Sequence, residues 1–250
     1  MKLNTSFRWT IMVLFVLGAF SFMVPTTFQT TDHATPRKGS VVGKITYDGS
    51  VPKLKPINMS SDPGCATLTD GKVRNQGLVL GDGNCLGNVF VQIKNAPVTR
   101  AAKNTAPVEM ELKGCMIEPR VVGVQAGQAL TFINTDNLVY QLTGKPKNNP
   151  AFKLPLSPRV GEQTLFFDEA DAIFGVKCDV HPWVSGYVAV MTHPYFMVTD
   201  VDGRFEFKNL PNGTYEIEAT HERLGTISGK VNIKDGQQRM DLVFEREGRK

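Results

Sequence analysis

Residues 174–191 read FGVKCDVHPWVSGYVAVM, and they carry the clearest signal for the architecture of this chain. Two apolar runs, 174–177 and 187–191, flank a short segment that holds Cys178 and His181. This pattern predicts two adjacent strands joined by a tight loop. The loop carries a soft thiolate and an imidazole, which are two of the four donors of a blue-copper centre: two His, one Cys and usually a weak axial Met.

Length and charge limit the classes of protein to which the chain can belong. At 250 residues, the chain is expected to form one domain of ordinary size and a smaller one. The net charge of +4 is spread along the chain, without a dense cluster of Lys and Arg. We therefore expect no nucleic-acid partner.

The N-terminus has the composition of an export signal. Lys2 and Arg8 precede an apolar run at residues 9–24, in the order of the charged and apolar regions of such signals. Residues 1–24 are predicted to be either a signal peptide or a retained membrane anchor, so we expect the protein in the periplasm or outside the cell. Residues 25–38, rich in Thr and Pro, are predicted to be a flexible tether.

The chain beyond the tether is predicted to be all-β. Short β-prone runs alternate with Gly, Pro, Asn and Asp, and no long stretch has an apolar period of 3.6 residues. The predicted strands are 41–47, 88–94, 108–112, 121–124, 129–134, 164–167, 174–178 and 187–191. Together they indicate a Greek-key sandwich. Residues 143–160 contain four prolines and are predicted to be a long loop.

A second β pattern begins at residue 193. The Asp202-Gly203 pair between the runs 197–200 and 204–207 predicts a hairpin. Further strands are predicted at 214–219, 225–233 and 240–244. We interpret this pattern as a small second sandwich or an extension of the first, with domains at 39–192 and 193–250.

Four cysteines in an exported protein permit disulfides without determining which residues pair. Cys65 lies in a turn-rich segment, and Cys115 follows the predicted strand 108–112. A disulfide between them would attach a long irregular connection to the sheet, and we expect this pair. Two free buried thiols are the alternative.

Several phrases, in one order along residues 39–222, resemble a group of exported bacterial cupredoxin-like proteins that carry a carboxypeptidase-regulatory-like, transthyretin-like C-terminal module. The loop at Cys178 is similar to the copper loop of plastocyanin, azurin and amicyanin. The other phrases are DPGC (62–65), KGC (113–115), VGVQAGQ (122–128), HPYF (193–196) and LPNGTY (210–215). The resemblance implies a cupredoxin-like sandwich followed by a small transthyretin-like sandwich.

The chain departs from this group at the metal ligands. Tyr140 stands where the resemblance implies a histidine, and Val184 stands where it implies the axial methionine. Arg120 follows Pro119 where the group has a histidine.

Three alternatives remain for the site. In the first, Cys178, His181 and Tyr140 bind copper as an unusual set of ligands. The phenol of Tyr140, with an ordinary pKa of about 10, must then lose its proton to bind the metal well. In the second, a histidine from elsewhere in the chain joins Cys178 and His181 and completes a blue-copper site. In the third, which we prefer, Tyr140 fills the cavity, His181 hydrogen-bonds locally and Cys178 is buried or oxidised, so no cofactor is expected.

The remaining candidates are weaker. A thiol released from copper could pair with Cys85, which suggests a Cys85–Cys178 disulfide. His193 and His221, with the adjacent Glu222, are candidates for a second metal site. The chain has no triad context or nucleophile elbow, so we do not expect an enzyme.

Three functions follow from these patterns. The first is an interaction module of the cell envelope that has a depleted copper site and binds an envelope protein. The second is a copper protein for one-electron transfer with Cys178, His181 and Tyr140 as ligands, whose partner would be a cytochrome or another redox protein. The third is attachment to a surface or a carbohydrate through the C-terminal module.

Overall fold

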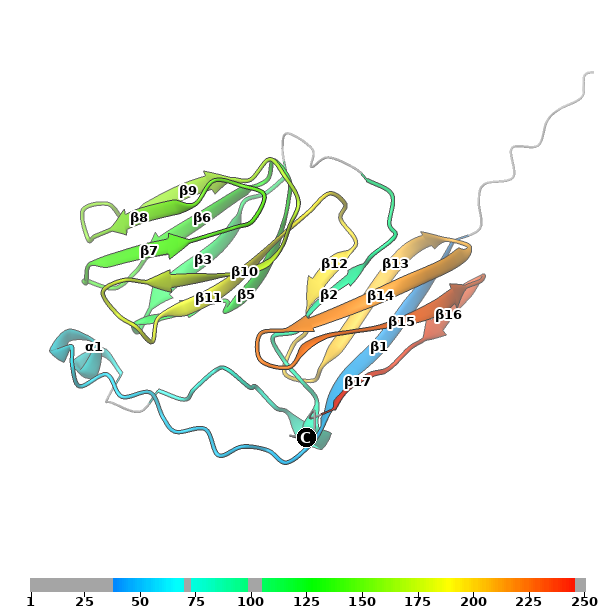
Figure 1. The fold of residues 1–250 in the computed structure, drawn as a ribbon, viewed down its shortest axis with the longest axis horizontal. Coiled ribbons are helices and arrows are strands. Elements are labelled where there is room, and N and C mark those ends of the chain that lie inside the picture. Colours follow the sequence, from blue (N-terminus) through cyan, green and yellow to red (C-terminus); the bar gives the residue numbers. More distant parts are fainter. Residues whose placement is uncertain (1–37, 70–72, 99–104, 246–250) are drawn as a thin grey trace, which may run out of the picture. The chain divides into compact units, whose positions relative to one another are not determined.

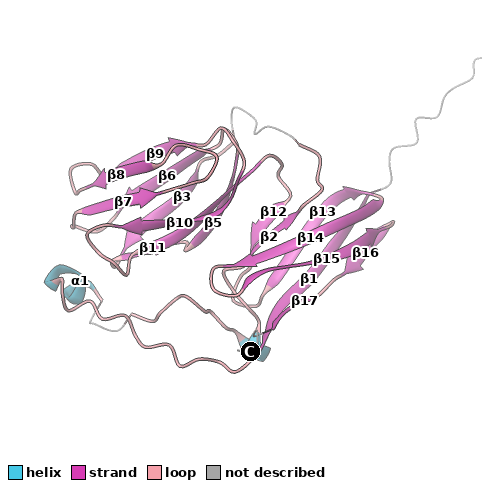
Figure 2. Cartoon of the chain, in the orientation of Figure 1, coloured by secondary structure: helices cyan, strands magenta, loops and turns pink. Residues whose placement is uncertain are grey.

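A computed structural model describes residues 38–69, 73–98 and 105–245. These residues are nearly all β, which confirms the predicted fold class (Figures 1 and 2). The strands are β1 (Lys38–Asp48), β2 (Phe90–Ile93), β3 (Val108–Lys113), β4 (Met116–Glu118), β5 (Val121–Gln125), β6 (Ala129–Asn134), β7 (Tyr140–Gly144), β8 (Phe152–Leu156), β9 (Glu162–Phe166), β10 (Asp171–Cys178), β11 (Ser185–Met191), β12 (Phe196–Val198), β13 (Arg204–Pro211), β14 (Gly213–His221), β15 (Gly225–Ile233), β16 (Gly236–Arg239) and β17 (Leu242–Glu245). One α-helix, α1 (Pro63–Leu68), and one short 3-10 turn, η1 (Asp82–Asn84), are also described.

The predicted signal or anchor at 1–24, and the predicted tether up to residue 37, lie outside the described residues. Among the helices that are described, none has the length and apolar character needed to cross a bilayer.

The first sandwich consists of two sheets. One has the strand order β5-β11-β10-β7-β8, and the other has the order β4-β3-β6-β9. Their inner faces share one core, to which Met110 and Phe132 contribute from one sheet and Val176 and Val188 from the other. Strands β10 and β11 are antiparallel neighbours, which confirms the strand-loop-strand pattern predicted around Cys178.

The second sandwich combines strands from both ends of the chain. One sheet has the order β13-β1-β16 with β17 also paired to β1, and the other has the order β12-β2-β14-β15. Val41 of β1 lies opposite Phe207 of β13, and Val91 of β2 lies opposite Ala219 of β14. All four side chains belong to a single buried core.

This strand pairing differs from the predicted domain division at residues 192 and 193. Strands β1 and β2 precede that boundary, yet they pair with strands that follow it. The first sandwich is therefore inserted between β2 and β12. A strand with one buried face has the same alternating pattern whichever sheet it joins, so local sequence could not assign β1 and β2.

Two predictions about local structure were wrong. The expected loop at 143–160 contains β8, an edge strand that pairs with β7. It tolerates Pro155 because a proline at a sheet edge need not donate a ladder hydrogen bond. The expected hairpin at Asp202-Gly203 is a turn between strands of different sheets, since β12 pairs with β2 and β13 with β1. Gly203, at φ +66°, accepts a hydrogen bond from the amide of Ile45 and so connects this turn to β1.

A long connection between β1 and β2 brings α1 to the first sandwich (Figure 1). Asp62 caps α1, because its side chain accepts a hydrogen bond from the amide of Cys65 at 3.0 Å. Cys65 is bonded to Cys115, beyond the end of β3, with their Cα atoms 5.6 Å apart. Met59 and Met116 complete a small buried cluster around the disulfide.

Candidate functional site

The loop after β10 holds the two donors that the sequence analysis singled out. The amide of Cys178 donates to the carbonyl of Val184 at 3.0 Å, and the amide of Val184 donates to the carbonyl of His181 at 2.9 Å. A third bond, from Asp179 to the carbonyl of Gln141, joins the loop to β7. Backbone hydrogen bonds therefore fix the loop both internally and against β7.

Cys178 and His181 face each other inside the protein. The Sγ atom of Cys178 lies 3.8 Å from the Nδ1 atom of His181, and the amide of His181 donates to the same sulfur at 3.4 Å. Cys178 is 5% exposed and His181 is 2% exposed. The thiol and the imidazole are therefore close together and shielded from solvent.

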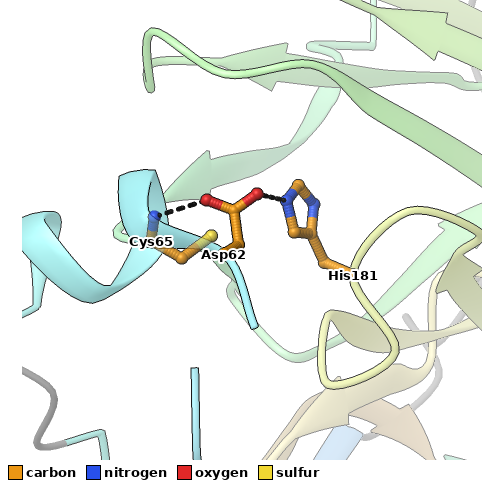
Figure 3. Close-up of side chains that lie close together, drawn as sticks. All are labelled: Asp62, Cys65 and His181. Atoms are coloured by element: carbon orange, nitrogen blue, oxygen red, sulfur yellow. Dashed lines mark hydrogen bonds and ion pairs between the residues drawn. The ribbon is translucent and has the colours of Figure 1, made fainter. Parts of the chain in front are cut away.

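Asp62 contacts the other nitrogen of His181 (Figure 3). The Nε2 atom lies 3.1 Å from the Oδ2 atom of Asp62, and the second carboxylate oxygen caps α1 through the amide of Cys65. The hydrogen bond from Cys65 and then the bond with His181 hold the pKa of Asp62 below its usual value. Because an ionised carboxylate can only accept a hydrogen bond, Nε2 of His181 donates to Asp62, and Nδ1 faces the thiol.

Tyr140 is fully buried beside His181, with ring centroids 5.0 Å apart. Its hydroxyl donates to the Oδ2 atom of Asp136 at 2.6 Å and lies 3.5 Å from the Sγ atom of Cys115. Burial, followed by the bond to Asp136, raises the pKa of Tyr140 well above its usual value. This residue is therefore a neutral hydrogen-bond donor.

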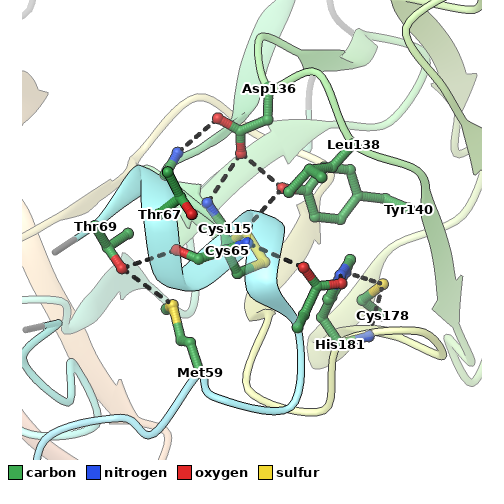
Figure 4. Close-up of a disulfide and its surroundings, with 12 residues drawn as sticks. Met59, Cys65, Thr67, Thr69, Cys115, Asp136, Leu138, Tyr140, Cys178 and His181 are labelled. Carbon is green, nitrogen blue, oxygen red and sulfur yellow. Dashed lines mark hydrogen bonds and ion pairs between the residues drawn. A yellow bond between two sulfur atoms is a disulfide. The ribbon is translucent and has the colours of Figure 1, made fainter. Parts of the chain in front are cut away.

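Asp136 organises the turn that carries Cys115 (Figure 4). Its carboxylate accepts hydrogen bonds from the amides of Gly114 and Cys115, both at 2.9 Å, in addition to the hydroxyl of Tyr140. Both turn residues have positive φ. The predicted disulfide between Cys65 and Cys115 is confirmed, and the alternative of two free thiols at these positions is wrong.

These residues do not supply a blue-copper donor set. Sγ of Cys178 and Nδ1 of His181 converge, but such a centre has a second imidazole and usually a thioether. The hydroxyl of Tyr140 is bonded to Asp136, and Val184, at the expected methionine position, is a buried residue without a donor atom. Two converging donors do not fit the copper site that the resemblance implies.

The structure gives the other candidate metal ligands separate partners. The Nδ1 atom of His193 accepts from the amide of Tyr195 at 3.2 Å, and that of His221 accepts from the amide of Arg223 at 3.3 Å. Burial lowers the pKa of both histidines. Glu222 is bonded to Arg120, so these contacts do not assemble the predicted second metal site.

The suggested disulfide between Cys85 and Cys178 is wrong, since both are buried free thiols. Cys85 forms a β-bridge with Thr46 of the second sandwich, whereas Cys178 ends a strand of the first.

Sequence reasoning missed Asp62 and Asp136 as members of the site. The Asp62-Pro63 pair is a typical start of a helix, with a capping residue before proline. That signal predicts the cap but cannot identify a partner so far along the chain.

No protein-family model matches the chain, and no curated protein matches it. Similar solved structures include the copper-containing nitrite reductase of Thermus scotoductus SA-01, with 20% identity over 38% of this chain and a TM-score of 0.31. The chain spans only 24% of that enzyme. Amicyanin from Paracoccus versutus is 19% identical over 40% of this chain and 96% of its own length, also with a TM-score of 0.31. These neighbours are cupredoxins. The transthyretin-like character of the second sandwich stays a prediction.

Proposed function

We propose that this chain is a non-catalytic binding module of the cell envelope that does not transfer electrons through a blue-copper centre. The observation that supports this proposal is the bond between the Tyr140 hydroxyl and Asp136 at 2.6 Å, because it removes the third donor from the Cys178–His181 pair. The expected partner is an envelope protein.

The burial of His181 beneath Asp62 also supports this function. An electron carrier must bring its redox centre close to its partner, and an exposed ligand edge is one way to do so. Here the outer nitrogen of His181 is bonded to Asp62, and the imidazole is 2% exposed. The same burial of Cys178 and His181 argues against a role as nucleophile and base, even though their order with Asp62 resembles a thiol–imidazole–carboxylate triad.

One distance favours the second candidate, a copper protein for one-electron transfer. Sγ of Cys178 and Nδ1 of His181 are 3.8 Å apart, and a thiolate and an imidazole that lie this close are donors that suit one copper ion. The missing donors argue against a stable blue centre. Attachment to a carbohydrate through the second sandwich stays a prediction.

Addition of Cu(II) to the purified oxidised protein, followed by its visible spectrum, tests the proposal. We expect no intense thiolate-to-copper band and no stoichiometric copper. The matched positive control is Tyr140→His with Val184→Met, which supplies the missing imidazole and thioether and should produce the band. An intense band in the unaltered protein that Cys178→Ser removes would establish the copper carrier instead.

A further inference from the structure

The Cys65–Cys115 disulfide, the imidazole of His181 and the carboxylate of Asp62 form a cluster of possible metal donors. In this cluster His181 presents Nε2, the nitrogen that does not face Cys178. We propose that reduction of the Cys65–Cys115 disulfide creates a zinc site made of the two thiolates, Nε2 of His181 and a carboxylate oxygen of Asp62. This inference does not depend on the proposed function, because it concerns the reduced chain and the outer nitrogen of His181.

The donors of this zinc site already lie close together (Figure 3). One ligand atom from each of Asp62, Cys65 and His181 lies within 4.8 Å of the others, and the carboxylate and the imidazole are 3.1 Å apart. Cys115 joins them, since its sulfur is bonded to that of Cys65. With zinc bonds of about 2.0 to 2.3 Å, two tetrahedral ligands are roughly 3.2 to 3.8 Å apart. Small side-chain rotations would therefore place all four donors around one ion.

Reduction is required because zinc binds thiolates, and sulfurs that are bonded to each other are not thiolates. A dithiol reductant would donate two electrons and two protons to the disulfide and would itself become a disulfide. Each new thiol then loses its proton as it binds the metal, so we expect release of about two protons per zinc ion.

Both cysteines keep their positions through bonds that do not involve the disulfide (Figure 4). Asp136 holds the amide of Cys115 at 2.9 Å. Asp62 accepts from the amide of Cys65 through Oδ1, which leaves Oδ2 directed at His181. The hydroxyl of Thr69 donates to the carbonyl of Cys65 at 3.0 Å. After reduction, these contacts would keep the sulfurs near the imidazole.

The surroundings suit a closed structural zinc site. Cys65 and Cys115 are fully buried, and His181 is 2% exposed, whereas the carboxylate of Asp62 is 31% exposed and offers a route for the ion. With zinc on Nε2, the proton of the imidazole moves to Nδ1, which faces the sulfur of Cys178 at 3.8 Å. Zinc-binding histidines commonly have such a partner on the second nitrogen. Two thiolates with an imidazole and a carboxylate favour zinc over magnesium or calcium.

Zinc titration of the full chain against a chromophoric chelator tests this proposal. The protein is compared in the oxidised form and after reduction with a phosphine under anaerobic conditions. We expect one zinc ion per reduced chain, no binding to the oxidised chain, and a zinc-dependent rise in the melting temperature of the reduced chain. Asp62→Asn and His181→Gln each alter a ligand of the ion, so each should weaken binding by at least about 10-fold, since even the loss of a ligand's hydrogen-bonding partner costs about 10- to 100-fold. Cys85→Ser is the matched control, because it removes a buried thiol of the second sandwich, and it should leave the affinity unchanged.

Three results would overturn the proposal. The first is equal zinc binding by the oxidised chain, and the second is binding that His181→Gln does not weaken. The third is full retention of binding in Cys65→Ser together with its loss in Cys178→Ser, which would place the ion on the inner side of the imidazole. Circular dichroism distinguishes binding by an unfolded chain: if reduction unfolds the protein, zinc must restore the β spectrum, and binding without that recovery contradicts the site.

Discussion

Asp62 and His181, which are 119 residues apart in the sequence, share a hydrogen bond of 3.1 Å between Oδ2 and Nε2. This bond connects the cap of a six-residue helix to the loop that carries Cys178. The disulfide connects the same helix to the turn after β3. One carboxylate thus links helix capping with the orientation of the buried imidazole.

Replacement of Asp62 by Ala should remove the cap of α1 and the partner of His181 together. We expect the free energy of unfolding to fall by about 1 to 2 kcal/mol, and we expect Cys178 to react faster with a thiol reagent. Urea unfolding and a labelling time course measure these two effects. Asp179→Ala, at an exposed carboxylate of the same loop paired with Lys153, is the control and should change neither quantity appreciably. Unchanged thiol reactivity in Asp62→Ala would show that the bond between Asp62 and His181 does not shield the thiol of Cys178.

The same carboxylate should contribute to stability in a defined pH range. The pKa of Asp62 in the folded state lies below its ordinary value of 3.8, so the unfolded chain binds this proton more readily. The contribution is complete above the ordinary value and is lost as the pH falls through the lower one. The stability difference between the native protein and Asp62→Ala should therefore shrink on acidification below 3.8.

A buried ion pair links the two sandwiches, and its loss should be costly. Arg120 donates from Nε and Nη2 to the two carboxylate oxygens of Glu222, both at 3.0 Å, and the two side chains are only 10% and 5% exposed. Arg120→Leu leaves the carboxylate buried without its partner, so we expect a loss of about 3 to 5 kcal/mol in urea unfolding. Arg239→Leu, which breaks an exposed pair with Asp241, should cost about 0 to 1 kcal/mol. Equal losses of unfolding free energy in the two variants would show that the buried pair contributes no more to stability than the exposed pair.

His221 should make the protein less stable as the pH falls from 6.5 towards 4. Burial, with smaller contributions from the charges of Arg223 and Arg120, lowers the pKa of His221 from 6.5 to about 4. Between these values the unfolded chain binds the proton and the folded chain does not, so the free energy of unfolding decreases on acidification, by at most about 3 kcal/mol. His221→Gln should flatten this slope in unfolding experiments across the range. A smaller slope should remain from His193, whose pKa is also lowered by burial, and an unaltered slope would contradict the assignment.

The hydroxyl of Tyr140 should contribute more to stability than the hydroxyl of Tyr215, another buried tyrosine. Tyr140→Phe removes one of three donors to the buried carboxylate of Asp136, with an expected loss of about 1.5 to 3 kcal/mol. Tyr215 donates to the neutral carbonyl of Pro211 at 2.9 Å, so Tyr215→Phe should lose only about 0.5 to 1.5 kcal/mol. Chemical unfolding of both variants measures the difference. A smaller loss for Tyr140→Phe would mean that the bond to Asp136 contributes little.

Local patterns predicted most strands, the site loop and the disulfide. The alternation of apolar residues and the positions of turn-forming residues depend only on neighbours in the chain, so they can be recognised in the sequence without a structure. Prediction failed at β8, where Pro155 suggested a loop, because its place at a sheet edge is not a local property. It failed again at the Asp202-Gly203 turn, where the following strand pairs with β1 rather than with the preceding strand.

The residue types of this chain establish an all-β fold and bring Cys178 and His181 onto one short loop, because strand periodicity and loop length act over a few residues. Long-range contacts decide the rest. They place β1 and β2 in the second sandwich, direct the hydroxyl of Tyr140 to Asp136, and set Asp62 against His181. A side chain can have many chemically suitable partners in a sequence, and only the packing of distant segments selects the one that it meets.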